Sequence, residues 1–324
     1  MKRKLLSCLT VIGMASTALF SANAWAKYPE KPIRLVVPFP AGGGTDVLAR
    51  LAARNLSAIL GQEVIVDNKG GAGTIIGGDA VAKAAPDGYT ILLSTASGFS
   101  INPQYNKKLP YKPEDFVHIG LISESPVVLV APFATPAKTL QELVRTLKDK
   151  ETPIATAGKG SQSHLSAVMF FNAINAKFRA VHYRGEAPAL VDLLAGQVPI
   201  YFASIPGTLA HLRTDKLRGY GVTTVARSPA APDIPSFTEQ GMPEVLATSW
   251  FGLAAPKGTP QEAINTLAAA LAKALDDKAM QDRLASDGAT TRKLSVSEFN
   301  DYMKRDYERW GKVLRAANID EDKE

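Results

Sequence analysis

Two glycine-rich turns are the residues most able to do chemistry in this sequence. The first runs from Pro40 to Asp46 (PAGGGTD) and the second from Ala157 to Ser163 (AGKGSQS). Each follows an apolar run and precedes apolar residues at helical spacing, so each should place backbone N–H groups at a helix N-terminus, where anions bind. The plain alternative is that the glycines only allow tight turns. Two such turns in equivalent places favour a cleft for a small molecule with an anionic group at one or both ends.

Other reaction chemistries lack their residue patterns. The run 71–77 (GAGTIIG) has one residue too many for a dinucleotide fingerprint and does not follow the first strand. No glycine run ends in Gly-Lys-Ser or Gly-Lys-Thr, and Ser161, although close to His164, lies in no G-x-S-x-G elbow. We therefore expect no catalytic residue, no metal and no cofactor, and an exported α/β hydrolase stays the alternative. The histidines, which show no metal-ligand spacing, are His118, His164, His182 and His211.

The N-terminus has the pattern of a secretory signal peptide covering residues 1–26. Residues 2–4 (KRK) are basic, 5–20 are mostly apolar, and 24–26 (AWA) match a small-x-small cleavage site. The apolar stretch is shorter than the roughly 20 residues that span a bilayer, which disfavours a retained anchor. The only cysteine, Cys8, lies inside this segment, and few apolar residues precede it as a lipid acceptor. A mature chain without cysteine forms no disulfide or thiolate site, and we expect it in the periplasm.

Composition and charge are those of an ordinary soluble globular protein. The 324 residues are 46% hydrophobic and 21% charged, which allows a substantial core. At about 150 residues per domain, this length fits two domains. From Lys27 onward the chain has 34 basic and 31 acidic residues, a balance that argues against a nucleic-acid partner.

Strand and helix patterns alternate along the chain, which predicts an α/β fold with mostly parallel sheets flanked by helices. The pattern restarts in mid-chain and returns to the first unit near Trp250, so we expect domain I at 27–124 plus 246–324 and domain II at 125–245. The expected strands are 33–39, 63–66, 90–94, 127–130, 153–157, 180–183 and 199–202, and two of the helices are expected at 165–174 and 188–195.

Capping signals and an apolar stripe mark several helices. The last helix presents its apolar residues on one face, which predicts core packing rather than a cofactor site. The stripe consists of Phe299, Tyr302, Met303, Trp310, Val313 and Leu314. The expected caps are Thr45 or Asp46, the box of Thr139 and Glu142, Thr259 with Pro260 at the first helical position, and the box of Ser295 and Glu298.

A series of motifs resembles one protein family. The run Ile33–Arg50 (IRLVVPFPAGGGTDVLAR) is similar to the opening of the Bug receptors, the extracytoplasmic solute-binding components of tripartite tricarboxylate transporters. The resemblance implies a two-domain periplasmic-binding-protein fold, type II-like with two crossover strands, and a ligand in the interdomain cleft. It continues in order to the last helix through 66–73 (VDNKGGAG), 85–90 (APDGYT), 158–164 (GKGSQSH), 182–185 (HYRG) and 192–197 (DLLAGQ).

The resemblance also implies which residues hold the ligand. Backbone amides and hydroxyls would bind a small carboxylate, and Asp46 would cap its helix rather than contact the ligand. The implied residues are Ala41, Gly42, Gly43, Gly44 and Thr45 as one cradle, Gly71, Ala72 and Gly73 beside it, Thr95 and Ser97 as hydroxyl donors, and Gly160, Ser161, Ser163 and His164 at the other end of the ligand.

One departure from the family pattern narrows the ligand class. Ala203 stands where many relatives have an acid, so a partner for a ligand ammonium is missing. This favours a non-amino dicarboxylate or an aromatic carboxylate over an amino acid. Phe39, Phe99 and Tyr183 could face an aromatic ring or belong to the ordinary core.

These observations together predict a periplasmic receptor that captures a small carboxylate, either a dicarboxylate or an aromatic carboxylate. It would act as a monomer and deliver its ligand to the membrane permease subunits of a tripartite transporter. Besides the hydrolase, the remaining alternative is a solute receptor used for signalling.

Overall fold

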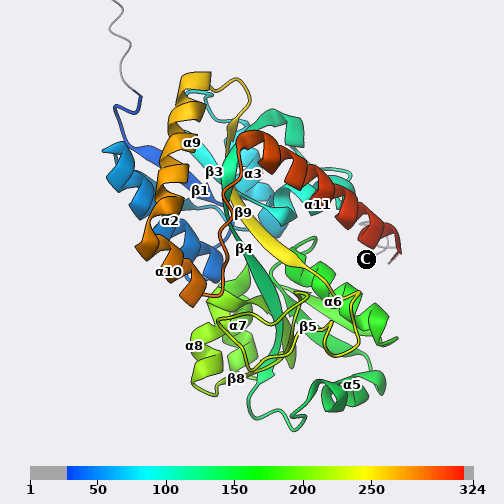
Figure 1. The fold of residues 1–324 in the computed structure, drawn as a ribbon. Helices are drawn as coiled ribbons and strands as arrows, with labels where there is room; N and C mark the ends of the chain where they lie inside the picture. The colour runs from blue at the N-terminus through cyan, green and yellow to red at the C-terminus, as the bar shows by residue number, and fades with distance from the viewer. Residues whose placement is uncertain (1–27, 317–324) are drawn as a thin grey trace, which may run out of the picture.

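A mixed sheet of nine strands runs through both lobes of the molecule (Figure 1). The computed structural model describes residues 28–316, so the predicted signal peptide and its cleavage site lie outside the described residues. The strand order is β2-β1-β3-β9-β4-β7-β5-β6, and β8 pairs with β4. The strands are β1 (Ile33–Val37), β2 (Val64–Asn68), β3 (Thr90–Thr95), β4 (Phe116–Pro132), β5 (Thr152–Thr156), β6 (Phe178–His182), β7 (Ile200–Ser204), β8 (Leu217–Val222) and β9 (Thr248–Pro256).

The long strand β4 connects the two lobes. Up to Pro126 it pairs antiparallel with β9, and from Val127 onward it pairs antiparallel with β7 and β8. Parallel pairs lie on either side: β1 with β2 and β3 in the first lobe, and β5 with β6 and β7 in the second. In Figure 1, β4 and β9 run through the middle of the molecule. The domain boundaries near residues 125 and 246 stay a prediction, which this change of strand partners supports.

Helices cover both faces of the sheet, as the alternating pattern predicted. In β1, Leu35 faces α2 and α9 whereas Val36 faces the opposite cluster with Phe299 of α11, because successive strand residues point to opposite faces. The first-lobe helices are α2 (Gly44–Leu60), α3 (Ile75–Ala82), α4 (Asn102–Tyr105), α9 (Gln261–Asp276) and α10 (Lys278–Ser286), those of the second lobe are α5 (Leu140–Lys148), α6 (Gln162–Ala173), α7 (Glu186–Leu194) and α8 (Ile205–Arg213), and the last is α11 (Val296–Ala316).

Two of the predicted helix caps are wrong and two are confirmed. The N-cap of α2 is Gly43, because the Asp46 carboxylate lies inside the first turn and accepts from the Gly42 amide at 3.0 Å. Pro260 is the N-cap of α9 rather than its first residue, and the Thr259 hydroxyl donates to a backbone carbonyl instead. The hydroxyls of Thr139 and Ser295 do accept from the amides of Glu142 and Glu298, as predicted.

The apolar stripe of α11 is core, as predicted, and its far end joins the two lobes. Phe299 and Met303 pack in the first lobe. Trp310 and Leu314 pack in one cluster with Leu165 of α6, a helix of the second lobe. Closing the lobes therefore buries apolar surface beyond the predicted site, which stabilises the closed arrangement.

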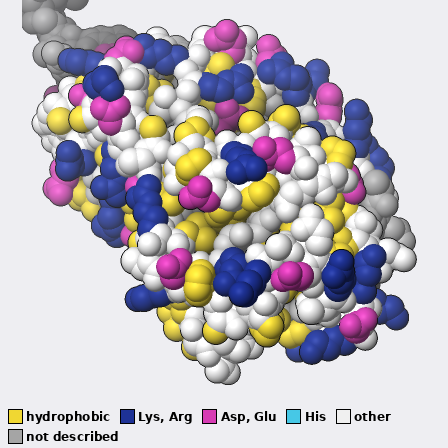
Figure 2. All heavy atoms as spheres, turned by 60° about the horizontal axis from the view of Figure 1, so that its bottom comes forward, with side chains coloured by type: hydrophobic (Ala, Val, Ile, Leu, Met, Phe, Trp, Pro, Cys, Tyr) yellow, Lys and Arg dark blue, Asp and Glu magenta, His cyan; other side chains and the backbone are white. Residues whose placement is uncertain are grey.

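The elements that were not predicted include α4, α8, β8 and α10. Helix α10 is short and mostly polar, so its pattern is weak. Among the described helices, none combines the length and apolar character that crossing a membrane requires. Figure 2 shows basic and acidic side chains interspersed over one face of the molecule, with apolar side chains in the hollow across it.

Candidate ligand-binding site

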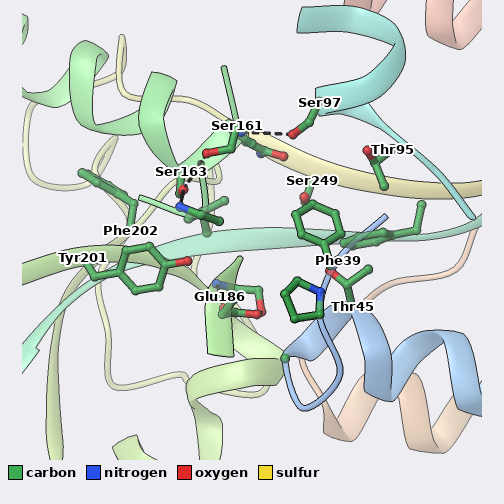
Figure 3. Close-up of a pocket in the computed structure, with 17 residues that line it drawn as sticks. Phe39, Thr45, Thr95, Ser97, Ser161, Ser163, Glu186, Tyr201, Phe202 and Ser249 are labelled. Carbon is green, nitrogen blue, oxygen red and sulfur yellow. Dashed lines mark hydrogen bonds between the residues drawn. The ribbon is translucent and has the colours of Figure 1, made fainter. Parts of the chain in front are cut away.

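A cavity of about 60 Å³ lies between the two lobes, at the carboxyl ends of β1, β3, β5 and β7. Its position is the one that ligands take in open α/β sheets. Both lobes contribute to its wall, which Figure 3 shows in close-up. The wall consists of Phe39, Pro40, Gly43, Thr45, Thr95, Ser97, Val127, Ala157, Ser161, Gln162, Ser163, Glu186, Tyr201, Phe202, Ser204, Ser249 and Phe251.

Hydroxyl groups gather at one end of the cavity, where α6 begins. Ser161 is the N-cap of α6 and its Oγ accepts from the His164 amide at 3.3 Å. The Ser161 Oγ also lies 3.0 Å from the Ser163 Oγ. From the first lobe, the Ser97 Oγ accepts from the backbone amide of Gln162 at 3.1 Å, so this end is already bridged between the lobes. Hydroxyls at a helix N-terminus suit an anionic ligand group.

The Gln162 side chain is the group at this end that lacks a partner. It is only 5% exposed, yet neither its Nε2 nor its Oε1 makes a hydrogen bond within residues 28–316. A buried amide without partners costs on the order of 1–3 kcal/mol. Since Gln162 lines the cavity, a ligand that hydrogen-bonds to this amide would remove that cost.

The first glycine turn is occupied by carboxylates of the protein itself. The Gly42 amide donates to Asp46, and the Gly44 amide donates to Oε2 of Glu186 at 2.9 Å. Ala41 and Gly42 are exposed, and Gly43 and Thr45 reach the cavity wall. Two amide donors of the predicted cradle are thus already paired.

Glu186 lies at the other end of the cavity (Figure 3). Its carboxylate accepts from the Ser204 amide at 2.7 Å and the Ser204 hydroxyl at 2.9 Å, besides Gly44. Burial raises the pKa of Glu186 above its ordinary value, and these three hydrogen bonds oppose the rise. The pKa of Tyr201 is also raised, first by burial and then by the charge of Glu186.

The segment Gly71–Gly73, which was predicted to lie beside the first turn, is not part of the cavity wall. Gly73 has φ +60°, and a Cβ there would overlap the backbone carbonyl of Lys159 in the other lobe. Gly160 has φ +69° and packs against Asn102. Ala72 also takes a positive φ, of 47°. These glycines let the lobes approach each other beside the cavity, which is a closure contact rather than a lining contact.

Several other predicted residues also lie outside the wall. His164 is 1% exposed and accepts from the Gly160 amide at 3.3 Å, and burial, with charges nearby, lowers its pKa to about 3. The Tyr183 hydroxyl donates to Asp192 at 2.7 Å. Ala203 and Phe99 are buried in the cores of the second and first lobes. The predicted residues that do line the cavity are Phe39, Gly43, Thr45, Thr95, Ser97, Ser161 and Ser163.

The second-lobe residues of the site that were not predicted include Glu186, which begins α7, and Ser204, which ends β7. Glu186 stands next to the Tyr183–Gly185 motif, but its role depends on Gly44, which lies 142 residues away. Gln162 stood inside a predicted turn, and its lack of partners is visible only in three dimensions. Among the described residues, no group of His, Cys, Asp or Glu could hold a metal ion.

The fold and the cavity define a class of protein: a two-lobed α/β solute-binding protein with its site between the lobes. Residues 48–319 match the family model described as tripartite tricarboxylate transporter family receptor. The chain is 38% identical to Protein BugT of Bordetella pertussis, over 95% of this chain and 97% of BugT. The chain therefore belongs to the tripartite tricarboxylate transporter receptor family, as its motifs indicated.

Solved structures agree with this assignment. MatC from Rhodopseudomonas palustris with bound malate is 31% identical, with a TM-score of 0.84, over 89% of this chain and 100% of that chain. An R. palustris protein with adipate is 31% identical, with a TM-score of 0.87, over 90% and 99%. The periplasmic-binding-protein fold is confirmed. Because the family consists of receptors, this protein is a solute-binding receptor and not an enzyme, and the hydrolase alternative is wrong.

Proposed function

We propose that this protein is a periplasmic receptor that captures a small carboxylate between its lobes and delivers it to the membrane subunits of a tripartite transporter. The observation that carries the proposal is the end of the cavity at α6. There the unpartnered side-chain amide of Gln162 lies beside the Ser97 and Ser161 hydroxyls. Neutral donors at a helix N-terminus can bind a carboxylate without a lysine or arginine.

The relatives support the ligand class. Malate and adipate, bound by two R. palustris proteins of the same fold, are both small dicarboxylates. An aromatic carboxylate is the second class that we proposed from the sequence. Phe39, Phe202 and Phe251 line the cavity and could pack against a ring. The two classes differ in the group at the second end of the ligand, where Glu186 lies.

The location and partners rest on the sequence and the family. The signal-peptide pattern over residues 1–26 supports export to the periplasm. Membership of a transporter receptor family supports delivery to a membrane permease rather than signalling. The nearly even charge supports a receptor without a nucleic-acid partner, and we propose that it acts as a monomer.

Native mass spectrometry of the freshly purified protein tests the ligand class directly. We expect a retained small carboxylate, released on unfolding and identified by its mass. Calorimetry with malate, adipate and benzoate then measures affinity. A retained ligand without a carboxyl group, together with no heat from these probes, would contradict the proposal.

A variant pair links binding to the proposed end of the cavity. Gln162→Met keeps the length of the side chain and removes both polar atoms, so we expect at least tenfold weaker carboxylate binding. Gln141→Met makes the same exchange at an exposed position of α5 and should leave the affinity unchanged. Equal affinities of the two variants would place the carboxylate elsewhere.

A further inference from the structure

Three helices begin at the Glu186 carboxylate. Glu186 is the first residue of α7, Gly44 is the first residue of α2, and Ser204 is the N-cap of α8. The amides of Gly44 and Ser204 both donate to the Glu186 side chain. A helix N-terminus carries partial positive charge, so this point favours an anion. The protein fills that place with its own carboxylate.

No Lys, Arg or His among the described residues that line this end of the cavity compensates a second negative charge. Of the residues that line the cavity within 28–316, the titratable ones are Glu186 and Tyr201, and none is Lys, Arg or His. Glu186 is 8% exposed, so water screens its charge poorly. A ligand carboxylate placed here would meet a like charge at short range.

The opposite end has the reverse character. The side-chain amide of Gln162 is buried and unpartnered there, and the hydroxyls of Ser97 and Ser161 lie beside it. Figure 3 shows Ser97 and Ser161 close together and Glu186 apart from both. One end therefore offers hydrogen-bond donors, and the other offers a hydrogen-bond acceptor.

We propose that the cleft is a one-carboxylate site: the ligand places its single carboxylate at Gln162 and presents a hydrogen-bond donor, such as an ammonium, hydroxyl or amide group, to Glu186. This inference rests on the proposed capture of a small carboxylate, and it replaces the dicarboxylate and aromatic classes by a ligand with one carboxylate and a donor group. It also revises an argument from the sequence, in which the missing acid at Ala203 disfavoured a ligand with a donor group. Glu186 supplies that acid from another element, bonded to the amide of the residue that follows Ala203.

Matched ligands of one chain length test the proposal. Succinate has a carboxylate at both ends, and succinamate, 4-hydroxybutanoate and 4-aminobutanoate replace one carboxylate by a donor group. Calorimetry should show that at least one of these three binds at least tenfold more tightly than succinate. Glutarate with glutaramate and adipate with adipamate repeat the comparison at longer chain lengths. A dicarboxylate that binds as tightly as its matched partners at every length would overturn the proposal.

The substitution Glu186→Gln assigns the preference to this carboxylate. It keeps the side-chain shape and removes the charge, so succinate should bind at least tenfold more tightly than to the wild type, and the preference for succinamate should shrink by the same factor. Because the readout is the ratio of two ligands on one variant, a general change in closure or stability cancels. Glu308→Gln, on the exposed face of α11, should leave the ratio unchanged.

The outcomes separate the two proposals. An unchanged ratio in Glu186→Gln would overturn the one-carboxylate inference while carboxylate capture stands. Binding of no carboxylate at any chain length would overturn carboxylate capture itself, and the inference with it.

Discussion

Replacing Gly44 by alanine should impair closure of the lobes without harming the fold of either lobe. A Cβ on Gly44 would lie 2.5 Å from the Ser204 Oγ and 2.8 Å from the Gly207 amide nitrogen in the other lobe. Carbon makes unstrained contacts at about 3.5–4.0 Å, so the lobes would have to separate locally by roughly 0.7 Å or more. Within the first lobe, alanine in place of glycine favours α2 by up to about 1 kcal/mol.

The expected loss follows from the contact that separation breaks. The Gly44 amide donates to the Glu186 carboxylate at 2.9 Å across the lobes, and a hydrogen bond to a charged group contributes about 1.5–3 kcal/mol. A ligand that binds only the closed form would then bind roughly ten- to a hundredfold more weakly. The melting temperature of the ligand-free protein should change little, because the clash is between lobes and not inside one.

The adjacent glycine provides the control for closure, which the radius of gyration measures; Gly43 itself lines the cavity. At Gly43 a Cβ would lie 3.5 Å from the nearest Glu186 atom, which is ordinary contact, and the backbone (φ −88°, ψ 170°) accepts alanine. Calorimetry with the tightest-binding carboxylate of a screen, and solution scattering for the radius of gyration, would compare Gly44→Ala with Gly43→Ala. If both variants bind and close like the wild type, the contact between α2 and α8 does not control closure and the reasoning is refuted.

Three further predictions concern capping, acid stability and closure. Ser161→Ala should lower both the ligand affinity and the unfolding free energy, the latter by about 1 kcal/mol for the lost cap. Ser295→Ala, which loses the cap of α11, should lower the unfolding free energy alone. Denaturant unfolding measures stability and calorimetry measures affinity, and equal affinity losses in the two variants would contradict the site. Burial lowers the pKa of His118 to about 4, so the unfolded chain takes up a proton near pH 6.5 before the folded one does. Unfolding free energy should therefore fall as pH drops below 6.5, by about 2 kcal/mol at pH 5 from this group. Urea unfolding at pH 7 and 5 should show a smaller fall in His118→Gln than in His211→Gln. Identical falls would exclude His118 as a source of the acid sensitivity. Scattering should show a smaller radius of gyration when a carboxylate saturates the protein, and an unchanged radius would argue against a cleft contacted by both lobes.

Local features of this protein followed from the sequence alone. Apolar runs, glycine turns and helical periodicity predicted the strand–turn–helix units, because each depends on residues close together in the chain. The N-caps at Thr139 and Ser295 were correct for the same reason. The predicted cap of α2 failed because the Asp46 side chain bonds back to the Gly42 amide from inside the first turn.

The character of the site was decided by how the lobes dock. Sequence spacing marks three consecutive glycines as equivalent, yet only at Gly44 would a Cβ clash with the other lobe. The Gly44 amide also donates to Glu186, which lies 142 residues away. The same docking leaves the side-chain amide of Gln162 buried without a partner. A hydrogen bond between distant residues has no periodicity or motif in the sequence. The choice between a carboxylate and a donor group at the second end of the ligand therefore depends on tertiary structure, where burial makes one charge decisive.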